Sequence, residues 1–89
     1  RDKASVIYRG LREAKLAFKD GQRNASKLTE MVRSMIESEP LAQIDYVSVV
    51  DADSLEMIEK VGDSEAMIAV AVRFGKVRLI DNVVLNRRQ

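Results

Sequence analysis

The sequence predicts an α+β fold in which a two-helix hairpin packs on a three-stranded, mainly antiparallel sheet, in the order α-α-β-α-β-β. Two stretches with a helical period fill most of the first 40 residues, and β-branched runs follow them. The last two runs flank the pair Gly75-Lys76, which suits a tight hairpin turn. A chain of 89 residues has room for one domain with one modest core.

The first predicted helix covers residues 3–19 and ends near Gly21, a typical left-handed residue after a helix. Its apolar stripe consists of Ile7, Leu11, Ala14 and Phe18, widened by Ala4, Tyr8 and Ala17. Gly10 lies inside this helix, where glycine costs about 1 kcal/mol relative to alanine. Close approach of another backbone would explain its presence.

The second predicted helix begins at an N-cap, either Asn24 or Ser26, and ends before Pro40. Its stripe consists of Leu28, Met31, Val32, Met35 and Ile36. The short connection to the first helix predicts an antiparallel pair. Met31 and Met35 suit either a plastic partner-binding face or the core, and methionine at helical spacing more often fills a core.

A strand at residues 45–50 and a short helix are predicted next. Asp53 would cap that helix, and Glu56 would reach back to it as in a capping box. Asp51, Asp53 and Glu56 also raise the alternative of a Mg²⁺ or Ca²⁺ site. Their spacing does not match a calcium-binding loop, and capping explains Asp53 and Glu56 without a metal.

The predicted hairpin joins strands at residues 67–74 and 77–85 through a type II′ turn that needs glycine first. The earlier strand is apolar on both faces, which is typical of a central strand covered on both sides. Asp81 falls on the apolar face of the later strand. Either a bulge near Asp81-Asn82 resets the register, or Asp81 has a fixed hydrogen-bonding role.

Composition excludes several classes of site. The chain has no cysteine and no histidine, so disulfides, thiolate metal sites and His-based catalysis are excluded. The net charge of +1 and the few aromatic residues argue against nucleic-acid binding, and no apolar run is long enough to span a membrane. Because the chain starts at Arg1, we expect it to come from a longer protein.

Charge is nevertheless uneven along the chain. Residues 44–66 hold seven acids and one base, and three cations follow at the hairpin end: Arg73, Lys76 and Arg78. These cations could meet a phosphate or a partner carboxylate, or serve as solvated charges at the edge of the sheet. A phosphate loop is excluded, because Val70 stands where its first glycine is required and a strand follows Gly75-Lys76. The residues alone offer no nucleophile–base pair.

Three segments carry a resemblance to a known family: ASVIYRGLREAK at residues 4–15, EPLAQIDYVSVVD at 39–51 and AVRFGKVRLIDN at 71–82. Together they resemble the C-terminal domain of the pantothenate synthetase (pantoate–β-alanine ligase) family. The resemblance runs from end to end and identifies residues 1–89 as a single C-terminal lid domain. The N-terminal Rossmann-like nucleotide-binding domain of the family, with its His-x-Gly-His motif, is absent from this sequence.

The resemblance implies a cytoplasmic, usually homodimeric ligase of coenzyme A synthesis. That enzyme uses ATP and Mg²⁺ to join pantoate to β-alanine through a pantoyl-adenylate. It implies no catalytic, cofactor or metal residue on this chain, which by itself should bind no cofactor and be inactive. Its partner would be the N-terminal catalytic domain, with no nucleic acid and no membrane.

We expect the lid edge to include Arg73, Lys76 and Arg78 of the hairpin, with Gly75 in its turn, or the adjoining strand edge at Asp45 and Tyr46. The competing interpretation is a free-standing α+β interaction or dimerisation module without catalysis.

Overall fold

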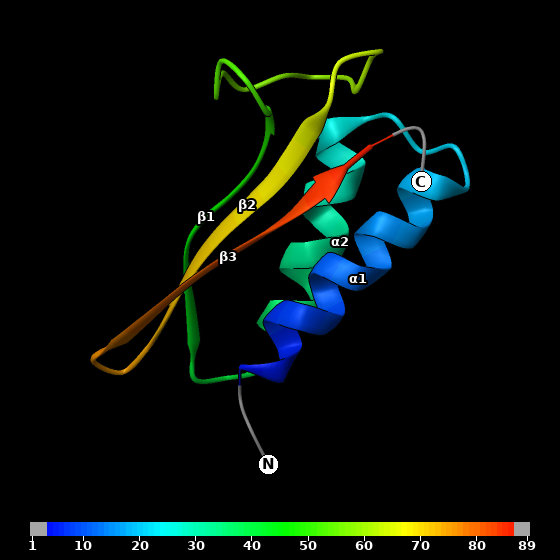
Figure 1. The fold of residues 1–89 in the computed structure, drawn as a ribbon. Helices are drawn as coiled ribbons and strands as arrows, with labels where there is room; N and C mark the ends of the chain where they lie inside the picture. The colour runs from blue at the N-terminus through cyan, green and yellow to red at the C-terminus, as the bar shows by residue number, and fades with distance from the viewer. Residues whose placement is uncertain (1–3, 87–89) are drawn as a thin grey trace.

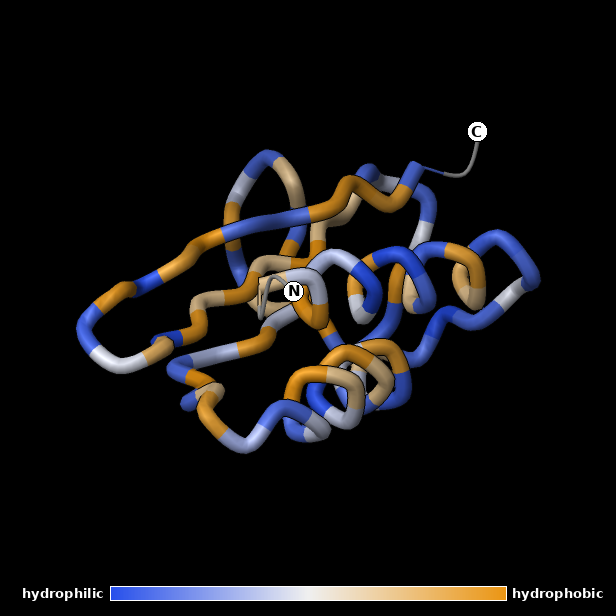
Figure 2. Tube along the Cα trace, turned by 90° about the horizontal axis from the view of Figure 1, so that it is seen from below, coloured by the Kyte–Doolittle hydropathy of each residue, from blue (hydrophilic) through white to orange (hydrophobic). Residues whose placement is uncertain are grey.

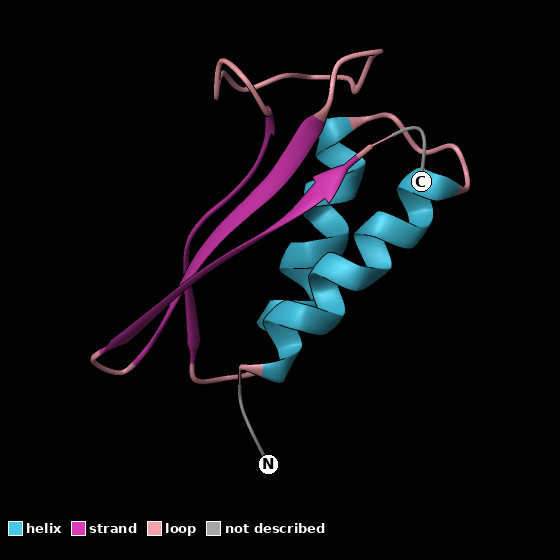
Figure 3. Ribbon diagram, in the orientation of Figure 1, coloured by secondary structure: helices cyan, strands magenta, loops and turns pink. Residues whose placement is uncertain are grey.

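The structure, a computed structural model, describes residues 4–86. It contains two helices, α1 (Ser5–Lys19) and α2 (Ala25–Glu37), followed by three strands, β1 (Ala42–Asp51), β2 (Ala66–Phe74) and β3 (Val77–Leu85) (Figure 3). The strands form one antiparallel sheet in the order β1-β2-β3. The predicted α+β class, with a helical hairpin on a three-stranded sheet, is confirmed. No helix within residues 4–86 has the length and apolar character needed to cross a bilayer.

The molecule has two layers, because both helices cover the same face of the sheet (Figure 1). Helix α2 contacts β1, and helix α1 contacts β3. We call the sheet face that carries the helices the inner face and the opposite face the outer face. The core lies between the helices and the inner face, where the buried side chains form one cluster.

Helix α1 buries the predicted stripe of Ile7, Leu11, Ala14 and Phe18, together with Val6. Its end is a Schellman motif, in which the N–H of Gly21 donates to the carbonyl of Phe18 and the N–H of Gln22 to that of Ala17. Gly21 has a φ of 114°, as this motif requires. The prediction that Tyr8 widens the apolar stripe was wrong, because Tyr8 is 64% exposed.

Helix α2 begins at Asn24, whose side-chain oxygen accepts a hydrogen bond from the N–H of Lys27 at 3.0 Å. The structure therefore selects Asn24 over Ser26 as the N-cap. The helix ends at Glu37, before Pro40. Its deeply buried residues are Leu28, Val32 and Ile36, each with 0% exposure.

The two helices approach each other closely at Gly10. A β-carbon added to Gly10 would lie 3.3 Å from the Cα and the carbonyl oxygen of Val32 and from the Cβ of Met35. Two of these atoms belong to the backbone of α2 and have little freedom to move away. The close backbone approach predicted for Gly10 is confirmed.

Strand β2 is the central strand and is buried on its inner face, where Ile68, Val70 and Val72 are fully buried. The hairpin to β3 turns at Gly75, which has a φ of 65°, while Lys76 keeps a negative φ. This combination defines the predicted type II′ turn. Figure 2 shows hydrophilic residues at this hairpin end of two largely hydrophobic strands.

The short helix predicted after β1 does not form, and residues 52–65 make a loop. The side chain that accepts the N–H groups of this turn belongs to Asp51 and not to the predicted cap Asp53. The Asp51 carboxylate accepts the N–H groups of Asp53 at 2.8 Å and Ser54 at 3.0 Å. Leu55 then adopts a φ of 64°, which breaks a helical path. The order of elements is α-α-β-β-β.

The bulge in the sheet lies in β1 and not near Asp81-Asn82. Strands β2 and β3 pair without a register shift, and Asp81 stands opposite Val70. The Asp81 carboxylate accepts a hydrogen bond from the N–H of Asn82 at 2.7 Å. Of the two alternatives for Asp81, the structure shows the hydrogen-bonded one, and the register shift falls between Ile44 and Tyr46.

The helix contact at Gly10 predicts the effect of a larger side chain. Gly10→Leu should lower the free energy of unfolding by about 1–3 kcal/mol, because the added atoms meet the backbone of α2. Arg9→Leu, on the exposed side of the same helix, should change it by less than about 0.5 kcal/mol. Urea unfolding followed by circular dichroism measures both. Equal stability of the two variants would contradict a tight contact at Gly10.

Candidate functional site

Three of the five predicted lid-edge residues form a charged cluster at the hairpin end of the outer face. Asp45 of β1 lies between two arginines, one from each of the other strands. Its carboxylate contacts Arg73 Nε at 3.2 Å and Arg78 Nε at 2.8 Å. We call these three residues the arginine–aspartate cluster.

Strand pairing explains why the two arginines need a carboxylate. Arg73 and Arg78 are directly opposite each other across β2 and β3, an arrangement in which like charges repel. The Asp45 carboxylate offers one oxygen to each guanidinium and so offsets this repulsion. The hairpin end therefore depends on a residue that lies 33 positions before Arg78 in the sequence.

The bulge in β1 is what brings Asp45 to this position. Ile44 pairs with Val72 and Tyr46 with Ala71, so Asp45 is the extra residue of the bulge. Asp45 reaches arginines of the outer face, and Tyr46 lies opposite Ala71 on the same face. After the bulge, Val47 returns to the buried inner face. The spacing of three residues from Ile44 to Val47, where strict alternation requires even spacing, is the sequence signal for this bulge.

The environment of Asp45 lowers the pKa of its carboxyl. The main cause is the hydrogen bond from Arg78, which outweighs an opposing effect of desolvation, and the positive charges of Arg73 and Arg78 lower the pKa further. A carboxyl whose pKa is lowered by folding stabilises the folded state at pH values above the ordinary pKa of that carboxyl. That contribution disappears as the pH falls through the lowered value.

The cluster can bind an anion but cannot perform acid–base catalysis. Both arginine side chains are about half exposed, and each contacts Asp45 through its Nε. Two guanidiniums against one carboxylate leave a positive charge suited to a phosphate or a carboxylate. Lys76 lies in the adjacent turn and forms no ion pair with any residue in the 4–86 range.

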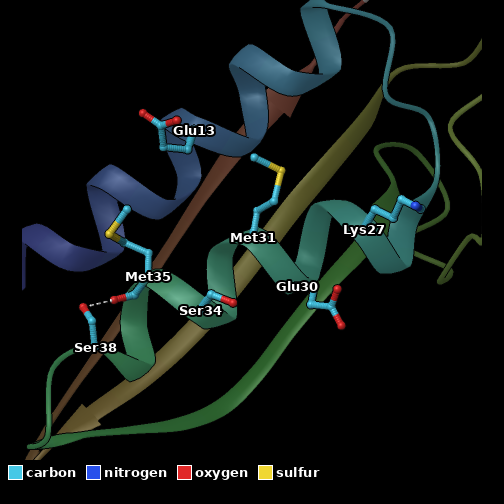
Figure 4. A pocket seen from close by; sticks show the side chains of 7 residues that line it. All are labelled: Glu13, Lys27, Glu30, Met31, Ser34, Met35 and Ser38. Atoms are coloured by element: carbon cyan, nitrogen blue, oxygen red, sulfur yellow. Dashed lines mark hydrogen bonds between the residues drawn. The ribbon is translucent and has the colours of Figure 1, made fainter.

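The predicted methionine face lies elsewhere, on the helices. Met31 and Met35 point from α2 toward α1 and line a groove of about 450 Å³ with Glu13 above them (Figure 4). Met35 packs against the core, as expected of a core methionine. The groove also holds Lys27 and Glu30, and its charges do not converge on one point.

The acidic residues considered as a metal site are not brought together as one. Among the described residues, the structure places no group of three acidic side chains where they could hold a metal ion. The Asp51 carboxylate instead accepts the two backbone N–H groups of the turn, and these hydrogen bonds lower its pKa.

One grouping was missed by sequence reasoning. A groove of about 340 Å³ is lined by Tyr8, Arg12 and Lys15 of α1 and by Asp81 and Asn82 of β3. The three-to-four-residue spacing of Tyr8, Arg12 and Lys15 places them on one side of α1, which is the only sequence signal for this groove. It gives Asp81 a polar environment at the margin of the core.

The pH dependence of stability tests the role of Asp45. Asp45→Asn should destabilise the protein at pH 7, because Arg73 and Arg78 lose their shared carboxylate. The difference from the unaltered protein should shrink below about pH 4 and vanish as the carboxyl becomes protonated. Urea midpoints measured from pH 7 to pH 2 check this. Lys76→Gln removes a charge that takes no part in the ion pairs of Asp45, and it serves as the control. A difference for Asp45→Asn that does not change with pH would contradict the ion pairs.

Comparison with known proteins identifies relatives along nearly the whole chain. The sequence profile of the family Pantoate-beta-alanine ligase matches residues 1–84. The pantothenate synthetase of Pelotomaculum thermopropionicum is 45% identical over 84 residues, which are 94% of this chain and 29% of that protein. The pantothenate synthetase of Roseiflexus sp. (strain RS-1) is 46% identical over 82 residues, or 92% of this chain and 29% of that protein.

A solved structure agrees with these relatives. The crystal structure of pantothenate synthetase from Thermus thermophilus matches with a TM-score of 0.84 and 26% identity, over 94% of this chain and 30% of that chain. The chain thus spans about 30% of the length of the relatives that it matches. The sequence resemblance is confirmed: the chain belongs to the pantoate–β-alanine ligase family.

Proposed function

We propose that this chain is the lid domain of an enzyme that condenses pantoate with β-alanine at the expense of ATP. The family match over residues 1–84 carries this proposal. The relatives named above are pantothenate synthetases, and about 70% of their length lies outside the match. The catalytic domain would be the part of the enzyme that the match leaves out.

The reaction of the family has two steps. Pantoate and ATP give pantoyl-adenylate and pyrophosphate, and the amine of β-alanine then attacks the acyl carbon to give pantothenate and AMP. The residues described here do not suit the binding of ATP with Mg²⁺, since the chain has no histidine and its carboxylates form no metal-holding group within residues 4–86. Nucleotide and metal would bind to the other domain, and no chemical step is assigned to this chain.

A lid has a physical purpose in this chemistry, because water that reaches an acyl-adenylate hydrolyses it before the amine can attack. Closing a domain over the intermediate excludes water and holds the reacting groups in place. A rigid domain with one core suits such a movement, and the arginine–aspartate cluster offers charged groups at one end of its sheet. In the proposed closed state, Arg73, Lys76 and Arg78 face the phosphates or carboxylates of the catalytic domain and its ligands.

The whole enzyme would be a cytoplasmic homodimer, as the family resemblance implies. A second candidate function is that of a free-standing interaction module, favoured by the exposed apolar residues of the outer face such as Ile80. The coding sequence upstream of Arg1 separates the two candidates. A His-x-Gly-His domain there supports the ligase, and its absence supports the interaction module.

Kinetics of the complete ligase test the orientation of the lid. Lys76→Glu and Arg78→Ala should each lower turnover or raise the KM for ATP by about tenfold, the effect of losing one charge-assisted hydrogen bond. Lys27→Glu and Arg33→Ala repeat the same charge changes on the exposed surface of α2 and serve as controls. Steady-state rates of AMP formation measure all four variants.

Unchanged turnover and KM in the hairpin variants would reject this orientation of the lid. The isolated 89-residue chain should give no heat on calorimetric titration with ATP and pantoate, since both ligands are assigned to the other domain. Measurable heat would instead place a ligand site on this chain.

A further inference from the structure

We propose that Asp81 keeps the open edge of β3 from pairing with the β3 strand of a second copy of this chain. The inference concerns association of the chain with itself and is independent of the proposed function. It assigns a role to the charged side chain that lies among the apolar residues of β3 on the inner face, which are Val77, Leu79, Val83 and Leu85.

The outer edge of β3 is open. β3 is the last strand of the sheet, and no further segment within residues 4–86 pairs with its outer edge (Figure 1). The edge of β1 is partly occupied instead, because the N–H of Ile58 donates to the carbonyl of Val49. β3 also pairs with β2 without a bulge. An unbroken open edge of this kind is a template for pairing with another strand.

The hairpin turn determines which backbone groups face this edge. A two-residue turn closes with a hydrogen-bonded pair, which here is Phe74 and Val77. Hydrogen-bonded and non-hydrogen-bonded pairs then alternate along an antiparallel ladder, so Asp81 and Val70 are again a hydrogen-bonded pair. The backbone groups that point away from β2, toward the open edge, therefore belong to Arg78, Ile80, Asn82 and Val84.

Asp81 is the middle residue of β3, which runs from Val77 to Leu85. A twofold arrangement pairs each residue with one that is equally far from the midpoint of the strand. Antiparallel pairing of two β3 strands along their whole length therefore places Asp81 opposite the Asp81 of the second copy. This would be a non-hydrogen-bonded pair with Cα atoms about 4.5 Å apart. Like charges directly opposite each other destabilise a sheet.

Shifted pairings do not avoid the carboxylate. A shift that keeps side chains on their own faces moves Asp81 opposite Leu79 or Val83 of the second copy. Either position would take a charge out of water beside an aliphatic side chain. Arg12 and Lys15 line the same groove as Asp81, but neither forms an ion pair with it within residues 4–86. Asp81 thus opposes symmetric pairing in each of these registers.

Self-association of the 89-residue chain tests this role. Asp81→Val should lower the dimer dissociation constant at least about tenfold, because an apolar pair replaces two opposed carboxylates. Asp81→Asn removes the charge at nearly constant shape and should also strengthen the dimer. Asn82→Val adds the same apolar side chain to the neighbouring exposed position and should behave like the unaltered chain. Sedimentation equilibrium at pH 7 and about 0.15 M salt, which screens distant charges, measures all four proteins.

A disulfide can locate the interface, because the chain has no cysteine of its own. The Asp81→Cys variant places two thiols opposite each other at the twofold axis, at a separation that a disulfide can span. Oxidised glutathione should therefore link it into a covalent dimer. The double variant Asp81→Val with Val77→Cys is the control, because its thiol would lie opposite Leu85 and should remain unlinked.

Equal dissociation constants for the unaltered chain and both neutral variants of Asp81 would overturn the proposal. An equally strong dimer of the Asn82→Val variant would also overturn it, since apolar character and not position would then cause the association. A dimer of the Asp81→Val variant without a disulfide in the Asp81→Cys variant would place the interface elsewhere and reject the β3 edge. If Asp81→Val is insoluble, Asp81→Asn decides alone: a tighter dimer supports the role of Asp81, and an unchanged constant rejects it.

Discussion

Burial of β2 against the helical pair is the constraint on which the rest of the structure depends. Ile68, Val70 and Val72 have no exposed surface, and they reach that state only because α1 and α2 lie close enough together to cover a narrow sheet. Gly10 permits that closeness by removing a side chain where the helices meet. The edge strands are then placed by pairing with β2, and the arginines of the hairpin follow from their register. The hairpin register places Arg73 and Arg78 opposite each other on the far side of the sheet.

Features set by local chemistry could be predicted from the sequence. The helical stripes, the Asn24 cap, the Gly21 end and the Gly75 turn all rest on residues within a few positions of one another. The grouping of Arg73 and Arg78 belongs here as well, since a tight hairpin necessarily brings these two side chains together. For the same reason, the cationic part of the candidate site could be recognised from the sequence.

Features set by competition between distant segments could not be predicted. The residues after β1 begin as a capped helix would, with the Asp51 carboxylate accepting the N–H groups of Asp53 and Ser54, but Leu55 adopts a φ of 64° and the N–H of Asp51 donates to the carbonyl of Glu56. The N–H of Ile58 then donates to the carbonyl of Val49, which draws the segment alongside β1. The partnership of Asp45 with both arginines depends on a bulge that places one residue out of alternation. Local propensity contains no information about such pairings.

The loop between β1 and β2 has a mechanical consequence. Its residues are tied to the connection between the helices, because the N–H of Ala25 donates to the carbonyl of Glu59 and the N–H of Val61 to that of Arg23. An isolated bridge between Asn24 and Lys60 lies between these two bonds. These hydrogen bonds connect the helices to the sheet at the end opposite the hairpin. A force applied at the hairpin is therefore transmitted to both layers of the fold. Such a unit would move as one rigid body.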